Sequence, residues 1–586
     1  MKLILKMAVV MVLLLLSNKS FAQTQKPVND STMSDEDSVY RMFKYLESFE
    51  VKDGIGRMIF LKDKFNGDFT YVGEIKNGKP NGRGVVLYTN NVAKKYFGLF
   101  KDGEFSGRGT ALYNDGRIVT GNWVNGKLNG TAAYLDKENR IQLCNFTNSI
   151  LEGEAKCIDS SNTMLIEHYK NDALNGRLTF VSADGANICD NIYEDNQKNG
   201  QGYQYSIKNK KLYQGIWKDG KWLQASMGNF SSFLSSPTFT SQDDNKYLML
   251  FEKTAANNTI EGTCFTIEKQ TGKIQFGIFE RGNLTDGMVC LKDNWYIGKV
   301  NNAMPDGYGL TYLKGNLLYL GERKKSARNG AGVNVSLATG EVFDGNFIDD
   351  KLDGDGMTLR QGNVIQIGSF YDYKLNGNAT VIKPSGAWAK GEFSYGNMRS
   401  DKIKQVGLSD NKIINPQPLT VSAAVNDLIK ISSSGFDDIE STNTISQEPG
   451  GYSEIAFQPE AEAWYHFPDF DDNHILKDAQ NHSSFYAVKL NIKDYKTAEK
   501  LYSELCSRIL ETNITTLHEN KIVKLKGIVT PFNPSDKTER SVETVFIPAE
   551  ANSFSHPEIK VSVVLRDERY ILKIYVKEVF TDFFKK

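Results

Sequence analysis

The sequence predicts a mainly β protein, built as an elongated single-layer sheet of stacked β-hairpins and followed by a small α+β domain. Three observations support this fold class. The 50 glycines accompany an aromatic content of 11%, which is typical of many tight turns that join short strands. Pairs of glycines recur with a period of about 23 residues, and large apolar side chains follow them at a fixed phase. Since a chain of 586 residues is too long for one compact core, several structural units are expected.

Residues 1–22 have the pattern of a signal peptide. A positively charged start precedes the apolar run 7–16, and Ser20-Phe21-Ala22 places small residues at the two positions that a signal peptidase reads. We therefore expect export to the periplasm or the cell exterior. The alternative is an N-terminal anchor, although the run is short for a bilayer span. Six cysteines are few for an exported protein, so disulfides are not expected to be the main support of the fold.

Residues 23–52 are expected to form an N-terminal segment with a short capping helix. Acidic residues at 34–37 precede apolar residues at helical spacing, which suits the first turn of an amphipathic helix. Such a helix would cover the open edge of the sheet. The alternative is a helix that lies on a membrane surface, but this segment lacks the basic polar face of such helices.

Two stretches, residues 53–222 and 247–400, form the repeat array, and each of its units predicts one β-hairpin. A Tyr-x-Gly-x-aromatic pattern marks the first strand, whose alternate residues point to one face. An Asn-Gly or Asp-Gly turn follows in several units, such as Asn77-Gly78, and a second glycine about nine residues after the first begins the return strand. The first glycine of each unit, here called the anchor glycine, occurs at Gly73, Gly98, Gly121, Gly215, Gly277, Gly298, Gly321, Gly345, Gly368 and Gly391, whereas Cys144, Glu167, Asn191 and Lys253 replace it in other units.

Two columns of apolar residues keep a fixed phase to these glycines. The second residue after the anchor glycine is aromatic in most units, and examples are Phe100, Trp123, Trp217, Phe347, Phe370 and Phe393. When the hairpins stack edge to edge, the columns would form one continuous spine, and the glycines leave room for the neighbouring rings. Arg323 and Lys292 interrupt the columns, which marks them as positions where the array could have a local function.

The pattern Tyr-x-Gly-x-aromatic-x-x-Gly-x-x-x-Gly-x-Gly, at this period, resembles the MORN repeat family over residues 54–398. The resemblance implies roles in protein association, self-assembly and contact with membrane surfaces. We therefore expect an exported, non-enzymatic scaffold or binding protein without cofactors, with an unidentified protein or a second copy of the chain as its partner. Binding of a glycan or a membrane surface by the array is an alternative, and glycan binding requires exposed Trp123, Trp217 or Trp388. The net charge of -1 gives nucleic acid no general attraction.

The repeat pattern is interrupted once and then stops. Residues 223–246 are expected to form an insertion between two arms of the array, and residues 401–418 are expected to form a linker. Residues 419–586 predict the small α+β domain. Its expected helices span residues 421–431 and 495–511, and its expected strands span residues 485–492, 523–525, 542–547, 559–565 and 570–576.

Candidate chemistry is concentrated in this tail domain. His466 and His474, with Asp469 and Asp471, are weak candidates for a metal site, because the spacing of eight between the histidines fits neither one turn of helix nor a short loop. We therefore expect solvated loop residues here, and neither a metal nor a cofactor. An enzyme, or a receptor for a small ligand or metal, in the tail domain is the alternative. Cys506 lies in the second expected helix, where a buried structural thiol is commoner than a nucleophile.

Cys144 and Cys157 bracket one hairpin at about equal distances from its turn. If the two residues lay opposite each other, an oxidising compartment would favour a disulfide between them. Two free, buried thiols are the alternative.

Overall fold

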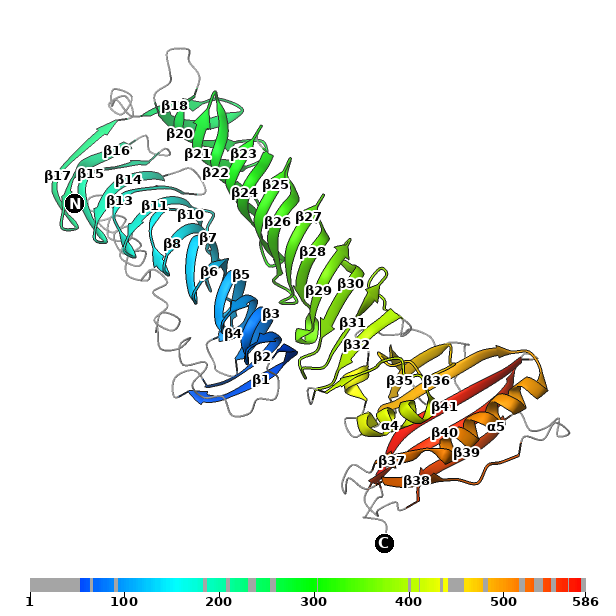
Figure 1. Ribbon diagram of the computed structural model, residues 1–586. Coiled ribbons are helices and arrows are strands. Elements are labelled where there is room, and N and C mark those ends of the chain that lie inside the picture. The colour runs from blue at the N-terminus through cyan, green and yellow to red at the C-terminus, as the bar shows by residue number, and fades with distance from the viewer. Residues whose placement is uncertain are drawn as a thin grey trace, which may run out of the picture. The chain divides into compact units, whose positions relative to one another are not determined.

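Strands dominate the protein (Figure 1). A computed structural model describes residues 53–63, 67–88, 93–182, 187–206, 211–229, 239–252, 260–302, 304–398, 402–409, 412–432, 436–440, 458–477, 483–515, 522–531, 541–549, 555–566 and 569–580. The chain divides into two compact units, of which the first contains nearly all residues up to 361 and the second contains residues 362–586. The mainly β class and the stacked antiparallel hairpins are confirmed.

The first arm of the array is an antiparallel sheet of successive hairpins. Strands that are neighbours in sequence pair with each other, except that β10 pairs with β8 past the two-residue β9, and β13 pairs with β11 past the two-residue β12. The strands are β1 (Gly54–Asp63), β2 (Gly67–Lys76), β3 (Lys79–Tyr88), β4 (Ala93–Lys101), β5 (Glu104–Tyr113), β6 (Ile118–Val124), β7 (Lys127–Leu135), β8 (Ile141–Thr147), β9 (Ile150–Leu151), β10 (Gly153–Ile158), β11 (Met164–Lys170), β12 (Ala173–Leu174), β13 (Gly176–Val181), β14 (Asn187–Glu194), β15 (Gln197–Ser206), β16 (Lys211–Lys218) and β17 (Lys221–Asn229).

The second arm repeats this hairpin order within the first unit. Part of the predicted insertion, residues 223–246, is strand, because β17 continues to Asn229 and the next strand begins at Phe239. The strands of the second arm are β18 (Phe239–Asp243), β19 (Tyr247–Glu252), β20 (Gly262–Glu268), β21 (Lys273–Glu280), β22 (Asn283–Leu291), β23 (Asn294–Asn301), β24 (Met304–Leu313), β25 (Leu317–Lys324), β26 (Ala327–Ser336), β27 (Val342–Ile348) and β28 (Lys351–Leu359), and the 3-10 turn η2 (Gln361–Asn363) follows.

The anchor glycines permit a close approach between paired strands. Gly321 lies opposite Gly332, and a Cβ atom on Gly321 would come within 2.5 Å of the Gly332 Cα. The ring of Tyr319 covers this glycine pair, and its hydroxyl donates to the carbonyl of Glu322 at 2.8 Å. In the preceding repeat, the hydroxyl of Tyr296 donates an equivalent hydrogen bond to the carbonyl of Lys299 at 2.6 Å. The Tyr-x-Gly pattern is therefore one packing unit, in which the tyrosine occupies space that only glycine leaves free.

Hairpin turns are connected to each other by a ladder of backbone hydrogen bonds. The amide of Gly103 donates to the carbonyl of Pro80 at 2.9 Å, and the amide of Gly126 donates to the carbonyl of Phe105 at 2.9 Å. The turn residue before each of these glycines has a positive φ, as at Asp102 (51°). Asn, Asp and Gly tolerate this conformation best, which explains their repetition in the sequence.

The predicted aromatic spine is present in the first arm. Rings of Tyr96, Phe100 and Trp123 pack edge to face, with centroid separations of 5.4 Å for Tyr96–Phe100 and 5.6 Å for Tyr96–Trp123. Phe105 stacks on Tyr96 at 3.6 Å. Each ring contacts residues from more than one hairpin, so the stability of one repeat depends on its neighbours.

The face opposite the spine is also buried along the middle of the strands, because the two arms contact each other within the first unit. The residue before each anchor glycine points to this second face, and Val72 and Ile297 are fully buried there. Lys156 of the first arm forms an ion pair with Asp286 of the second arm at 2.9 Å, and Arg108 forms one with Asp344. The sequence predicted one elongated single-layer sheet in two arms, and the structure adds the contact between the arms.

The second unit begins with the last hairpins of the array. Its strands β29 (Ile365–Tyr371), β30 (Lys374–Ile382), β31 (Trp388–Phe393), β32 (Ile403–Gly407) and β33 (Ile413–Ile414) pair in sequence order. The predicted linker, residues 401–418, is therefore wrong in part. Backbone pairing of β32 with β31 extends the sheet beyond the last repeat, although the glycine pattern has ended.

The tail domain is an eight-stranded antiparallel sheet with two helices packed against it (Figure 1). The predicted helices and five predicted strands are confirmed, whereas three further strands were missed. The sheet has the order β34 (Gln458–Glu462), β35 (Asp472–Lys477), β36 (Ser483–Ile492), β41 (Arg569–Phe580), β40 (Ser555–Arg566), β39 (Ser541–Pro548), β38 (Ile522–Lys526) and β37 (Asn513–Thr515), and the helical elements are α4 (Val421–Ser432), η4 (Asp437–Ile439) and α5 (Tyr495–Glu511).

Two predictions for the N-terminal region, the signal peptide at residues 1–22 and the capping helix within residues 23–52, lie outside the described residues. No helix in the described part of the chain is long and apolar enough to cross a membrane.

Candidate functional site

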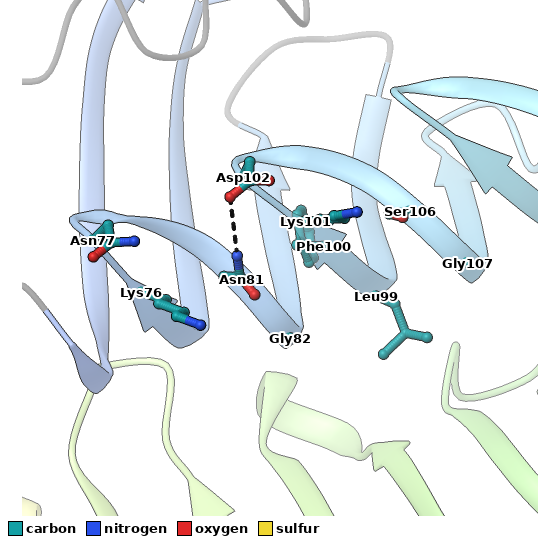
Figure 2. A pocket seen from close by; sticks show the side chains of 10 residues that line it. All are labelled: Lys76, Asn77, Asn81, Gly82, Leu99, Phe100, Lys101, Asp102, Ser106 and Gly107. Carbon is teal, nitrogen blue, oxygen red and sulfur yellow. Dashed lines mark hydrogen bonds between the residues drawn. The ribbon is translucent and has the colours of Figure 1, made fainter.

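A groove of about 520 Å³ lies beside the turns of the first two complete hairpins (Figure 2). Strands β2 and β3 form one of these hairpins, and β4 and β5 form the other. The groove is lined by four equivalent positions of the two hairpins, together with Leu99 and Phe100 of the second. These positions are Lys76, Asn77, Asn81 and Gly82 in the first hairpin and Lys101, Asp102, Ser106 and Gly107 in the second.

Two glycines keep this groove open. Gly82 has a φ of +105°, and Gly107 has a φ of +72°, so both adopt a backbone conformation that other residues rarely adopt. A Cβ atom on Gly107 would lie 2.9 Å from the Leu99 side chain, and one on Gly82 would overlap the carboxylate of Glu74. That carboxylate is held in place, because it accepts a hydrogen bond from the amide of Arg83 at 2.6 Å. The hollow is therefore a consequence of the repeat itself.

Polar contacts fix the turns at the rim. The side-chain amide of Asn81 donates to the carboxylate of Asp102 at 3.4 Å, which connects the return strand of one hairpin to the turn of the next (Figure 2). The backbone amide of Asn77 donates to the carboxylate of Asp53 at 2.9 Å. The first of these bonds joins the two hairpins at the groove, and the second fixes the turn of the first hairpin.

Lys76 and Lys101 are exposed and occupy the same position in their repeats, three residues after the anchor glycine. Neither ammonium group has a hydrogen bond or an ion pair with a described residue. Phe100 is 3% exposed and contributes an apolar floor, and the half-buried Leu99 lies on the same strand as Lys101. The groove therefore offers two cations, an amide, the Ser106 hydroxyl and apolar surface to one ligand.

The aromatic side chains that recur from repeat to repeat are used for packing. Trp123, Trp217 and Trp388 are 4%, 5% and 6% exposed, so the tryptophan platform required for glycan binding is absent at these positions. Trp123 packs edge to face on Tyr96 and Phe105 of the preceding hairpin, and the ring of Trp388 lies against Gly407 of the next strand. The same burial applies to the spine residues Phe100, Phe347, Phe370 and Phe393.

Arg323 and Lys292 interrupt the apolar columns of the sequence, and the structure gives each of them a role in packing or in a turn. The guanidinium of Arg323 lies over the ring of Tyr319, 5.2 Å from its centroid, and donates to the carbonyl of Ser326. Lys292 does not belong to a column at all. It occupies a hairpin turn with a φ of 54°, where its carbonyl accepts from the indole of Trp295 at 3.2 Å.

The predicted disulfide between Cys144 and Cys157 is not formed. Both thiols are free and buried. The register of β8 and β10 places Cys157 opposite Gln142 rather than opposite Cys144. The two cysteines are not equidistant from the turn, because the turn lies at Asn148 and Ser149, nearer to Cys144. The pairing also shifts by two residues between Phe146–Leu151 and Leu143–Lys156.

In place of a disulfide, this part of the array contains a buried polar network. Glu167 is 2% exposed and accepts hydrogen bonds from Arg140 at 2.8 Å, Gln142 at 3.2 Å and Tyr169 at 3.2 Å. The guanidinium of Arg140 also donates to the Cys157 sulfur. These residues lie in the units that depart most from the repeat pattern, so the network compensates for the missing anchor glycines.

The weak metal candidates of the tail domain are dispersed. His466 contacts the side-chain amide of Asn473 at 3.0 Å, and Asp471 accepts from the amide of Leu490 at 2.7 Å. Asp469 adopts a φ of 64° in the loop before β35. The described residues contain no group of three or more His, Cys, Asp or Glu side chains arranged to hold a metal ion.

The expectation of solvated loop residues is wrong for His474. This residue lies in β35, opposite Tyr486 of β36, and is only 4% exposed. Neither ring nitrogen has a hydrogen-bond partner, and burial lowers the pKa of His474 to about 4. Cys506 is buried in α5 as expected, and burial raises the pKa of its thiol to about 12.

The groove residues Lys76, Lys101, Asn81 and Ser106 were not identified as site residues from the sequence. One signal was present, since aligned copies of the repeat keep a lysine three residues after the anchor glycine in both hairpins and a glycine six residues later. Only the structure shows that these positions face the same hollow.

The residues that build the groove also match a known family. Residues 71–92, 96–116 and 120–134 match the MORN repeat. The chain contains MORN repeats. The groove lies within the first two matched MORN repeats, and the pattern of anchor glycines extends the same hairpin geometry to the rest of the array. A search of curated proteins returned no match to the chain.

Proposed function

We propose that this protein is an exported, non-enzymatic scaffold that uses its MORN array to associate with another protein. The observation that supports the proposal is the groove at the first two MORN repeats, which combines unpaired cations with apolar floor residues. MORN repeats are generally modules for association with proteins or membranes, which agrees with a binding role.

The composition of the groove favours recognition over catalysis. Its lining residues include no histidine, cysteine or glutamate. Asp102 accepts a hydrogen bond from Asn81 and is therefore engaged at the rim, rather than placed as a base for Ser106. Acid–base or nucleophilic chemistry would need such a pair within hydrogen-bond reach.

Export rests on the pattern of residues 1–22. The proposal predicts that the mature protein begins at Gln23, and N-terminal sequencing of protein from the cell envelope or the medium tests it. A protein that retains residues 1–22 and stays with the cytoplasmic fraction would contradict export.

Site-specific photo-cross-linking in cells tests the scaffold role. A photoreactive amino acid replaces Ser106 in the groove, and a control protein has it in place of Ile528, which is 91% exposed in the tail domain. We expect mass spectrometry to identify one defined protein, or a second copy of this chain, cross-linked from position 106 and not from position 528. Absence of any protein cross-link from position 106, at normal protein levels, would overturn the proposal.

A further inference from the structure

We propose that the groove at the first two MORN repeats binds an extended acidic segment of the partner, with carboxylate side chains at positions i and i+3 and an apolar side chain at i+6. This inference rests on the proposed function, because it names the chemistry of the partner at the same site.

The repeat sets the spacing of the two cations. Lys76 ends β2 and Lys101 ends β4, and β3 lies between these two strands. Neighbouring strands are about 4.8 Å apart, so equivalent positions in successive hairpins are separated by roughly 9.6 Å. A polyproline II segment has three residues per turn and rises about 3.1 Å per residue, so its residues i and i+3 lie on one side roughly 9.3 Å apart. The two periods match, whereas a β-strand would turn residue i+3 to its opposite side.

The chemistry of the lining selects carboxylates. Both lysine ammonium groups lack a partner among the described residues. Asn81, on the strand between the two lysines, and Ser106, on the strand beyond Lys101, add two side-chain donors to the lining (Figure 2). The half-buried Leu99 lies on β4, two residues before Lys101, and offers an apolar surface to a proline or another apolar residue beside the second acidic residue.

The third repeat extends the match between the repeat spacing and the segment to residue i+6. The position equivalent to Lys76 and Lys101 is occupied there by Val124, which is 47% exposed. A segment that continues along the hairpins in the same conformation would place residue i+6 over this valine. Lys76, Lys101 and Val124 together therefore select a segment with the order acidic, acidic, apolar at intervals of three residues. Because this order is not symmetric, the segment can bind in one direction only.

Fluorescence anisotropy with the full mature chain tests the inference. The probe is a labelled peptide Glu-Pro-Pro-Glu-Pro-Pro-Leu, and the matched control has the same composition with its two glutamates adjacent. We expect the spaced peptide to bind about fivefold more tightly than the control. We also expect K76Q and K101Q each to weaken binding about two- to fivefold, as for exposed ion pairs. Raising the NaCl concentration from about 50 mM to about 300 mM should also weaken binding of the spaced peptide to the native chain.

A lysine at the same repeat position provides the control variant. Lys170 is exposed and also lies three residues after an anchor position, but outside the groove, so K170Q should bind the spaced peptide as the native chain does. Equal affinity for the spaced and the control peptide would overturn the inference. So would unchanged binding by K76Q and K101Q, or binding to vesicles of anionic phospholipid through these lysines without binding to the peptide.

The two proposals can fail separately. A partner that is cross-linked from position 106, together with no binding of the spaced peptide, refutes the acidic segment and leaves the scaffold intact. Binding of the spaced peptide without any cross-linked protein in cells refutes the scaffold role.

Discussion

Arg140 and Glu167 form a buried ion pair, in which Nη2 of the arginine lies 2.8 Å from Oε2 of the glutamate. Glu167 occupies the position at which other repeats have the anchor glycine. A charged side chain is tolerated there because Gln142 and Tyr169 also donate to its carboxylate. Hydrogen bonds of this kind are required when a charge is removed from water.

Replacing Glu167 by glutamine should therefore destabilise the array strongly. The substitution leaves the Arg140 guanidinium buried without an opposite charge, and we expect a loss of about 3–5 kcal/mol in the free energy of unfolding, measured by urea denaturation. Glu138 is exposed and pairs with Lys137, so E138Q should change stability by less than about 0.5 kcal/mol. Similar losses for the two variants would contradict a special role for the buried pair.

Replacing Gly321 by alanine should show that the anchor glycine is required for space rather than for backbone freedom. The new Cβ would lie 2.5 Å from the Gly332 Cα and 2.6 Å from the Tyr319 hydroxyl. We expect a loss of about 2–3 kcal/mol, measured as a shift of the urea midpoint. Gly315 has a φ of +71° but open space around its Cα, so G315A tests conformation alone and should cost about 1 kcal/mol. A larger loss for G315A would reverse this assignment.

The buried His474 should make the stability of the tail domain dependent on pH. Burial lowers its pKa in the folded state to about 4, whereas the unfolded chain has the ordinary value of 6.5. Below pH 6.5 the unfolded state therefore binds a proton that the folded state rejects, so stability falls as the pH decreases toward 4 and is independent of this group above pH 6.5. The full loss is about 3 kcal/mol.

The variant H474L isolates this effect. Its urea midpoint should be equal to or higher than that of the native chain at pH 7, and the difference should grow as the pH is lowered, because the buried imidazole satisfies no hydrogen bond. His168 in the array is 39% exposed on its side chain, and H168Q should leave the pH dependence of the tail domain unchanged. Parallel pH profiles for H474L and the native chain would contradict the prediction.

The contact between the two arms should depend on Lys156 and Asp286. Asp286 receives hydrogen bonds from Lys156 at 2.9 Å and from Lys299 at 3.0 Å. Burial alone would raise its pKa, but the two ammonium groups hold the pKa of this carboxyl below its ordinary value. A double-mutant cycle with K156Q and D286N should give a coupling of about 1 kcal/mol, measured by urea unfolding.

The exposed pair of Lys269 and Asp243 offers the comparison, since a cycle with K269Q and D243N should give a coupling close to zero. If the coupling between Lys156 and Asp286 were equally small, the polar contact would contribute nothing to the packing of the arms.

The strands of the array were predictable because each repeat encodes its own hairpin. The positive φ at Asp102 follows from a local preference of Asp and Gly, and Tyr319 covers a glycine only two residues away. The helix α5 was also predicted at its observed bounds, since its apolar side has a helical period. The structure adds that Asp494 caps its first turn by accepting from the amide of Thr497. The strand β35 was missed because Asp472 to Lys477 shows no alternation and is strand only through pairing with its neighbours.

The sequence by itself determined the repeat, its hairpins and its aromatic spine, because all of these depend on residues within one or two periods of each other. Tertiary structure decided which charges meet and which remain free. Arg108 and Asp344 are far apart in the chain and become partners only when the arms pack, whereas Lys76 and Lys101 remain unpaired beside a hollow that two glycines create. Hairpin geometry follows from local backbone preferences, but the pairing of distant charges depends on burial and long-range packing, which no short pattern contains.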